Sequence, residues 1–112
     1  MNSRERVNFA LNHQEPDRVP LDLGASATTG MHVTTIYTLR QALKLDPPET
    51  PVKVKEPYQM LGEIKPDLLK ALGVDAVGLN SGTTVFGFKN EDWTPRRLFD
   101  GTPVLVPGKI KV

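Results

Sequence analysis

The chain has 112 residues, a formal net charge of +1 and no cysteine. This length allows one domain with one modest core, and the balanced charge gives no electrostatic reason to expect a nucleic acid or an anionic membrane as partner. Without cysteine, these residues form no disulfide, thiolate metal site or cysteine nucleophile. We find neither a secretory signal nor an apolar run of about 18 residues, so we expect a cytoplasmic protein.

The amino-terminal segment has the pattern of a short helix. Ser3 is a good N-cap, and Val7, Ala10 and Leu11 follow the spacing of one helical face. We therefore predict a helix from about Arg4 to His13, with its apolar face turned inward.

A strand and a loop are predicted next. Pro16 ends the helix, and the apolar run Val19–Leu23 is a first strand candidate. The stretch "GASATTG", from Gly24 to Gly30, is small, hydroxylated and flexible. It predicts a loop.

A second amphipathic helix follows, with its apolar residues at helical spacing: Val33, Ile36, Leu39 and Leu43. The proline-rich stretch Lys44–Pro51 is a connector. "VKVK", residues 52–55, is so short and so charged that we expect no more than an edge strand or an extended arm.

The middle of the chain predicts a helix in two pieces. Pro57 suits the first turn of a short helix that carries Tyr58, Met60 and Leu61. Pro66 starts a second piece with Leu68, Leu69 and Leu72 facing inward, and Gly73 is well placed as its left-handed C-cap.

The last predicted elements are a strand and a hairpin. "VDAVGL", Val74–Leu79, has the composition of a buried strand. Asp100-Gly101 lies between "RRLF" and "TPVLV" and predicts a hairpin, in which Trp93 packs.

The order of elements predicts an α/β fold that matches the beginning of a (β/α)8 barrel. A complete barrel needs about 250 residues, so residues 1–112 would supply its amino-terminal third. A small self-contained α/β domain is the alternative.

The loop after the first predicted strand is the best candidate site, because barrels bind ligands at the carboxyl ends of their strands. "GASATTG" is no phosphate-binding motif, and a plain connector remains the alternative. Asp22, within the strand, either faces a wet barrel mouth or pairs with a partner such as Arg18. His32 lies near the loop and is a weaker candidate, whereas His13 is expected to complement the helix dipole. Asp75 is expected to be a turn or cap acid.

Three stretches resemble the amino-terminal third of the uroporphyrinogen decarboxylase family: "SRERVNFALNHQEPDRVPLDLG", "PVKVKEPYQMLGEIKPDLLKALGVDAVGL" and "DWTPRRLFDGTPVLVPG". The resemblance implies a TIM barrel. It places the chain among uroporphyrinogen decarboxylases and methylcobalamin-dependent thiol methyltransferases. Together with the position of the loop, it gives a set of expected substrate-binding residues: Asp22, Gly24, Ser26, His32 and Asn80. We expect no catalytic or metal-binding residue in this segment.

The sequence departs from the decarboxylase pattern at two places. Decarboxylases follow the first strand with an Arg-Gln-Ala-Gly-Arg segment that holds substrate carboxylates, where this chain has "GASATTG". Arg40-Gln41-Ala42 is not that segment, because it lies within the second predicted helix. The catalytic Asp of the decarboxylases is also missing, since the corresponding stretch here is Asn80-Ser81-Gly82.

These departures favour the methyltransferase-like branch. In that branch, zinc and methylcobalamin would act in the complete protein, on residues that come later in the barrel. A corrinoid protein or a tetrapyrrole would be the partner of the complete protein, and a homo-oligomer is compatible with this interpretation. Decarboxylation by the parent protein and a non-catalytic binding or assembly module are the alternatives. We expect the 112 residues alone to be inactive.

Overall fold

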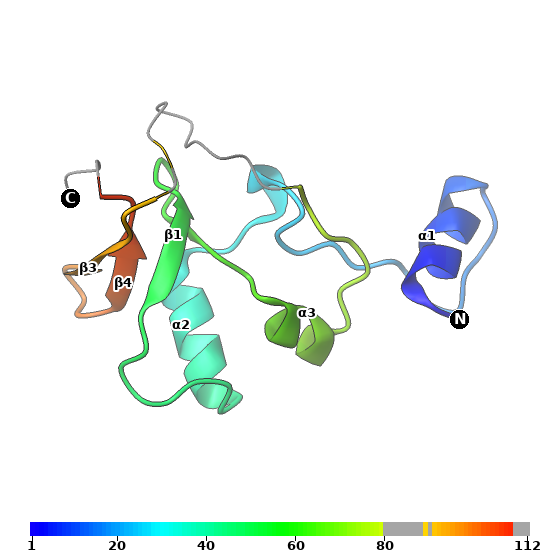
Figure 1. Ribbon diagram of the computed structural model, residues 1–112. Helices are drawn as coiled ribbons and strands as arrows, with labels where there is room; N and C mark the ends of the chain where they lie inside the picture. The colour runs from blue at the N-terminus through cyan, green and yellow to red at the C-terminus, as the bar shows by residue number, and fades with distance from the viewer. Residues whose placement is uncertain (80–88, 90, 109–112) are drawn as a thin grey trace.

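The computed structural model describes residues 1–79, 89 and 91–108. Their helices and strands, in chain order, are α1 (Ser3–Leu11), the 3-10 turn η1 (Ala27–Thr29), α2 (Val33–Ala42), β1 (Val52–Glu56), β2 (Leu61–Gly62), α3 (Pro66–Leu72), β3 (Thr94–Arg97) and β4 (Pro103–Val106) (Figure 1). The fold is mixed α/β, as predicted. Within this described part of the chain, no helix is long and apolar enough to cross a membrane.

A four-stranded sheet in the order β2-β1-β4-β3 forms the centre of the structure. β1 runs parallel to β4, and the other two pairs are antiparallel. The prediction that residues 52–55 form at most an edge strand or arm was therefore wrong. β1 lies between two partners, and the alternate residues Val52 and Val54 are buried in the core. Its lysines occupy the opposite face of the strand, where they lie against Trp93, with Lys53 Nζ 4.9 Å from the ring centre.

The core lies between the sheet and α2, which packs against β1 and β2. Val33 and Ile36 of α2 are fully buried, as predicted, and Leu39 packs partly buried against the same cluster. The fourth residue of the predicted face, Leu43, follows the helix and is 43% exposed. Val52, Val54, Leu68, Val104 and Val106 complete the buried cluster. A single layer of side chains therefore holds the helix on the sheet.

Gly62 lets α2 approach the sheet closely. A Cβ atom here would lie 2.8 Å from Ile36 Cδ1 and 3.1 Å from the Val33 Cα atom, which belongs to the backbone. We expect Gly62→Ala to lower the free energy of unfolding by about 1 to 3 kcal/mol, the usual cost of crowding a packed core. Urea denaturation of the two proteins measures this. Gly101→Asn is the control, since the Cβ position of Gly101 is open and Asn tolerates its positive φ. Equal losses in the two variants would contradict the packing argument.

The carboxyl-terminal hairpin is confirmed. β3 and β4 pair antiparallel, and Gly101 adopts a φ of 88° in the turn between them. The Asp100 carboxylate accepts a hydrogen bond from the Thr102 backbone N–H at 3.0 Å. Through β4, this hairpin gives β1 its parallel neighbour.

Helix α1 differs from the prediction in its ends and in its packing. Asn2, rather than Ser3, is the N-cap and accepts the Glu5 backbone N–H, and the helix ends at Leu11. The expected apolar face is not buried: Leu11 is exposed, and Arg6 is the buried residue of this helix. Figure 1 shows α1 apart from the sheet. Polar contacts therefore hold this helix.

The prediction of a helix in two pieces is confirmed for the second piece only. The first piece is absent, since a turn over residues 57–60 leads into β2. The Glu56 carboxylate accepts the backbone N–H groups of Tyr58 and Gln59, which favours the turn over a helix. The second piece is α3, with Pro66 at its start, Leu68 buried and Gly73 as a left-handed C-cap with φ 70°.

The two predicted strands at residues 19–23 and 74–79 are extended segments instead, and they lie side by side (Figure 1). The Asp75 backbone N–H donates to the Leu21 carbonyl at 2.8 Å, and further along Gly78 lies directly against the Ala25 carbonyl. The residue numbers rise in the same direction in both segments, from the Leu21–Asp75 contact to the Ala25–Gly78 contact, so the segments run parallel. They are not buried, because no further strand among the described residues pairs with them: Val77 is 81% exposed and Leu79 102%. The expectation of a buried strand was wrong for this reason.

Candidate functional site

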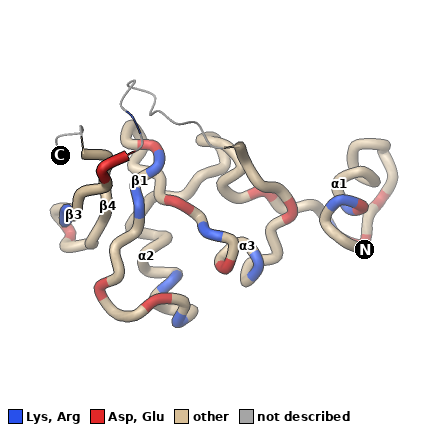
Figure 2. Tube along the Cα trace, viewed as in Figure 1, with Lys and Arg blue, Asp and Glu red and all other residues tan. Residues whose placement is uncertain are grey.

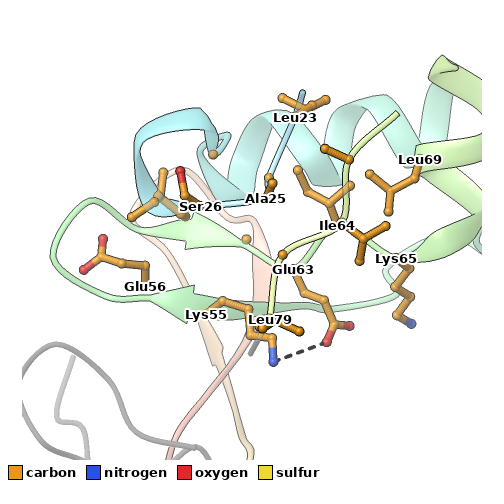
Figure 3. Close-up of a pocket in the computed structure, with 18 of the residues that line it drawn as sticks. Leu23, Ala25, Ser26, Lys55, Glu56, Glu63, Ile64, Lys65, Leu69 and Leu79 are labelled. Atoms are coloured by element: carbon orange, nitrogen blue, oxygen red, sulfur yellow. Dashed lines mark ion pairs between the residues drawn. The ribbon is translucent and has the colours of Figure 1, made fainter. Parts of the chain in front are cut away.

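A half-open cavity of about 510 Å³ lies beside the parallel segments (Figure 3). Apolar side chains line one part of it, among them Leu23, Ile64, Leu69 and Leu79. A polar rim is formed by Lys55, Glu56, Glu63 and Lys65. The cavity therefore offers an apolar surface with charged groups at its border.

The position of the cavity follows from the direction of the two segments. Its lining includes Leu23, the last residue of the first segment, with Gly24 and Ala25 directly after it, and residues 76–79, the last four of the second segment. Ligands in parallel α/β structures bind beyond the carboxyl ends of the strands. The cavity occupies the equivalent place here.

The loop from Gly24 to Gly30 closes on itself at the edge of the cavity. Gly24, at φ 88°, donates its N–H to the Thr29 carbonyl at 2.8 Å. Asp22 Oδ1 accepts the Ala25 N–H and the Thr29 hydroxyl at 3.2 and 3.3 Å. A Cβ atom on Gly24 would lie 2.7 Å from Ile64 Cδ1, so glycine lets the loop seat on the cavity wall. The loop is a defined turn with a local hydrogen-bond network.

The charges of the rim compensate one another. Lys55 Nζ lies 3.8 Å from Glu63 Oε2, an ion pair without a hydrogen bond. Glu56 is engaged by the turn amides of residues 58 and 59. Figure 2 shows the same alternation of basic and acidic positions from β1 to α3. No arginine is among the described residues that line the cavity, so this part of the lining offers no guanidinium group to a polycarboxylate.

The structure brings some of the predicted site residues together. Gly24 and Ser26 line the cavity, whereas Asp22 organises the loop from outside the lining. His32 is also outside the lining, where its Nδ1 caps α2 by accepting the Thr34 N–H at 3.1 Å. Asn80 lies outside the described residues. Of the two alternatives for Asp22, pairing with Arg18 is not observed, because Arg18 binds Asp75.

Asp75 is the residue that sequence reasoning undervalued. Its carboxylate, with a side chain only 1% exposed, accepts hydrogen bonds from Ser3 Oγ (2.8 Å), Arg6 (2.6 Å), Arg18 (2.9 Å) and the Leu21 N–H (2.9 Å). The Leu21 N–H bond, with those from Ser3 and the two arginines, holds the pKa of Asp75 well below its ordinary value, although burial opposes the shift. Asp75 thus joins α1 to both parallel segments. It is no simple turn or cap acid.

A second buried cation, Arg40, ties α2 to α3. Its guanidinium forms paired hydrogen bonds with Asp46 and with Asp67, at 2.6 to 2.9 Å. The bonds from Arg40 lower the pKa of Asp67 to about 2 and also lower that of Asp46. As expected, Arg40 lies within a helix and not in a substrate-binding loop. Its role here is structural.

The described residues contain no group of three His, Asp or Glu side chains that could hold a metal ion. His13 and His32 lie in different parts of the chain, at the end of α1 and at the start of α2. Zinc therefore has no fitting ligand set in the described part of the protein.

A comparison of the chain with protein-family models finds no match. Searches of curated proteins and of solved structures find no significant similarity.

Proposed function

We propose that the chain is the amino-terminal part of a (β/α)8 barrel protein of the uroporphyrinogen decarboxylase family, of the methyltransferase-like branch. In this proposal, loop 24–30 and residues 76–79 form one side of a substrate site at the barrel mouth. The observation that carries it is the cavity at the carboxyl ends of two parallel segments, without an arginine in its described lining.

The path of the chain supports the barrel. Between the two parallel segments it passes through α2, the β1–β2 pair and α3, and it returns alongside its starting point. A parallel neighbour reached through a crossover with helices is the repeating unit of α/β barrels. The sheet around β1 would then be an insertion into the first unit.

The character of the cavity favours methyl transfer over decarboxylation. A polycarboxylate pyrrole needs several cationic forks, and the rim instead offers two lysines and two glutamates that largely offset each other. An apolar wall with a neutral border suits a smaller substrate with little net charge.

The zinc and the methylated corrinoid of such a reaction would be held outside the described residues. Zinc would lower the pKa of a substrate thiol, and methylcobalamin would supply the methyl group. The role of this segment would be to orient the substrate through loop 24–30 and the apolar wall.

Two steps test this proposal. The coding sequence that follows these residues should encode a set of His and Cys ligands, and the whole protein should transfer the methyl group of methylcobalamin to mercaptoethanol in a zinc-dependent reaction. The methylated thiol is detected by mass spectrometry. Carbon dioxide release from uroporphyrinogen, or a continuation without that ligand set, would contradict it. The 112 residues alone should show neither activity.

Ala27→Arg tests the missing cationic cradle. Ala27 is exposed on the cavity border, so an arginine there would place a bidentate donor where a carboxylate ligand would enter. We expect the variant to bind uroporphyrin, a polycarboxylate tetrapyrrole, roughly tenfold more tightly than the original chain, as measured by calorimetry. Thr38→Arg, on the exposed side of α2, controls for added charge and should have little effect. Tight uroporphyrin binding by the original chain would contradict the argument from the rim.

A further inference from the structure

One ammonium group at the border of the cavity has no hydrogen-bond acceptor among the described residues. Lys55 Nζ lies 3.8 Å from Glu63 Oε2, which is longer than a hydrogen bond, and 5.9 Å from the centre of the Trp93 ring. An ammonium group carries three N–H donors. The described part of the protein therefore attracts the charge of Lys55 from two sides but satisfies none of its donors.

Lys55 is also not an ordinary surface lysine. Its side chain is only 30% exposed, and that of Glu63 is 23% exposed; Figure 3 shows the two at one border of the cavity. β1 sets the direction of the Lys55 side chain, because Val54 before it points to the opposite face and is buried in the core. Partial burial of a charge without an acceptor is unfavourable, since protein groups have displaced part of its water. An acceptor on a bound ligand would remove this cost.

The other charges near the rim are already engaged or well exposed. The Glu56 carboxylate accepts the two turn amides of residues 58 and 59. Lys65 lines the cavity but is exposed, so its ammonium is open to solvent. Lys53 lies 4.9 Å from the centre of the Trp93 ring, outside the lining, and adds positive charge behind Lys55. Lys55 is therefore the rim group best placed to hold an anion.

We propose that the cavity binds a monocarboxylate with an apolar chain. The carboxylate accepts hydrogen bonds from Lys55, and the chain lies on the apolar wall that includes Leu23, Ile64 and Leu79. Ligand sites of this kind join an apolar lining to a few polar groups that fix the orientation of the ligand. One ammonium matches one carboxylate, whereas a polycarboxylate needs several cations. This inference rests on the proposed function only in using the same cavity, and it adds a class of ligand.

An NMR titration of the 112-residue chain with octanoate tests this inference. We expect the largest shift changes at the amides of residues 24–26 and 62–65, which line the cavity. Lys55→Met should weaken octanoate binding roughly tenfold and change octanol binding less than about twofold, because octanol has the same chain without the charge. Lys70→Met is the matched control and should leave both affinities nearly unchanged, since Lys70 is an exposed lysine of α3 outside the lining.

Glu63→Gln provides a test that damage to the fold cannot imitate. It removes the carboxylate that repels the ligand and attracts Lys55, so octanoate should bind roughly threefold more tightly. The inference would be overturned by shift changes outside the lining only, by equal weakening of octanoate and octanol in Lys55→Met, or by no gain in Glu63→Gln. Octanoate binding without methyl transfer by the whole protein would remove the proposed function and leave this inference, and the reverse result would do the opposite.

Discussion

Replacing Asp75 by asparagine should release α1 and loosen the two parallel segments while the sheet stays folded. Asparagine presents one acceptor and an NH₂ group to two guanidinium groups, so the bonds from Arg6 and Arg18 cannot all form. The core cluster around β1 and α2 does not include these residues. We expect amide exchange in α1 and residues 19–25 to quicken by roughly tenfold or more, with little change in β1 and β4, as measured by mass spectrometry.

Asp17→Asn is the matched control. Asp17 pairs with the same Arg6, but its side chain is about half exposed and does not bind the parallel segments. Asp17 makes no hydrogen bond to residues 19–25, so exchange there should stay nearly unchanged, although losing its paired hydrogen bonds to the buried Arg6 should loosen α1 itself. If both variants behaved alike, Asp75 would not be the residue that joins these parts.

Acid should release α1 in the original chain, as the Asp75→Asn substitution does at neutral pH. The pKa of Asp75 is lower in the folded chain than in the unfolded chain, so the carboxylate stabilises the folded state fully above a pH of about 4. That contribution falls as the pH drops from there towards the folded-state pKa. Release of α1 therefore belongs to strongly acidic solutions and not to the neutral range.

The elements that the sequence predicted correctly are those with local signals. The spacing of apolar residues in α2, Pro66 and Gly73 around α3, and Asp100-Gly101 in the hairpin all act over a few residues. The errors have two sources: local side-chain bonds such as those of Glu56, which replaced a helix by a turn, and long-range partners. Residues 52–55 became a central strand because β4 pairs with them, and no pattern within "VKVK" indicates that partner.

The same distinction holds for the candidate site. Gly24 and Ser26 were found from the general position of ligand sites at strand ends, and both line the cavity. The Asp75 network joins residues that are far apart in the chain: Arg18 lies 57 positions and Arg6 lies 69 positions before Asp75. A single sequence contains no local signal that predicts these contacts. Lys55, Glu63 and Lys65 reach the cavity rim from β1 and from the segment before α3, which again depends on the tertiary fold.

Arg40→Met should destabilise the fold far more than the loss of an exposed ion pair, because it leaves two carboxylates facing each other beside the core. Arg40 is only 3% exposed, and it binds both Asp46 and Asp67 through paired hydrogen bonds. Removing one partner of a fully buried pair costs roughly 3 to 5 kcal/mol; since the Asp67 side chain is 44% exposed, we expect about 2 to 3 kcal/mol at neutral pH. Urea denaturation gives this value. Arg97→Met, which breaks the exposed Arg97–Glu49 pair, should cost less than about 1 kcal/mol.

The pH dependence of the Arg40 variant separates lost electrostatics from lost packing. In the original chain, Arg40 lowers the pKa of Asp67 to about 2, so the pair is stabilising above a pH of about 4 and this contribution is lost as the pH falls towards 2. In Arg40→Met the two carboxylates repel each other, so their pKa values should rise above the unfolded ones. Protonation then relieves the repulsion, and the gap in unfolding free energy between the two proteins should narrow between pH 7 and pH 4. A gap that stays constant over this range would mean that Arg40 stabilises the fold by packing of its side chain and not by its charge.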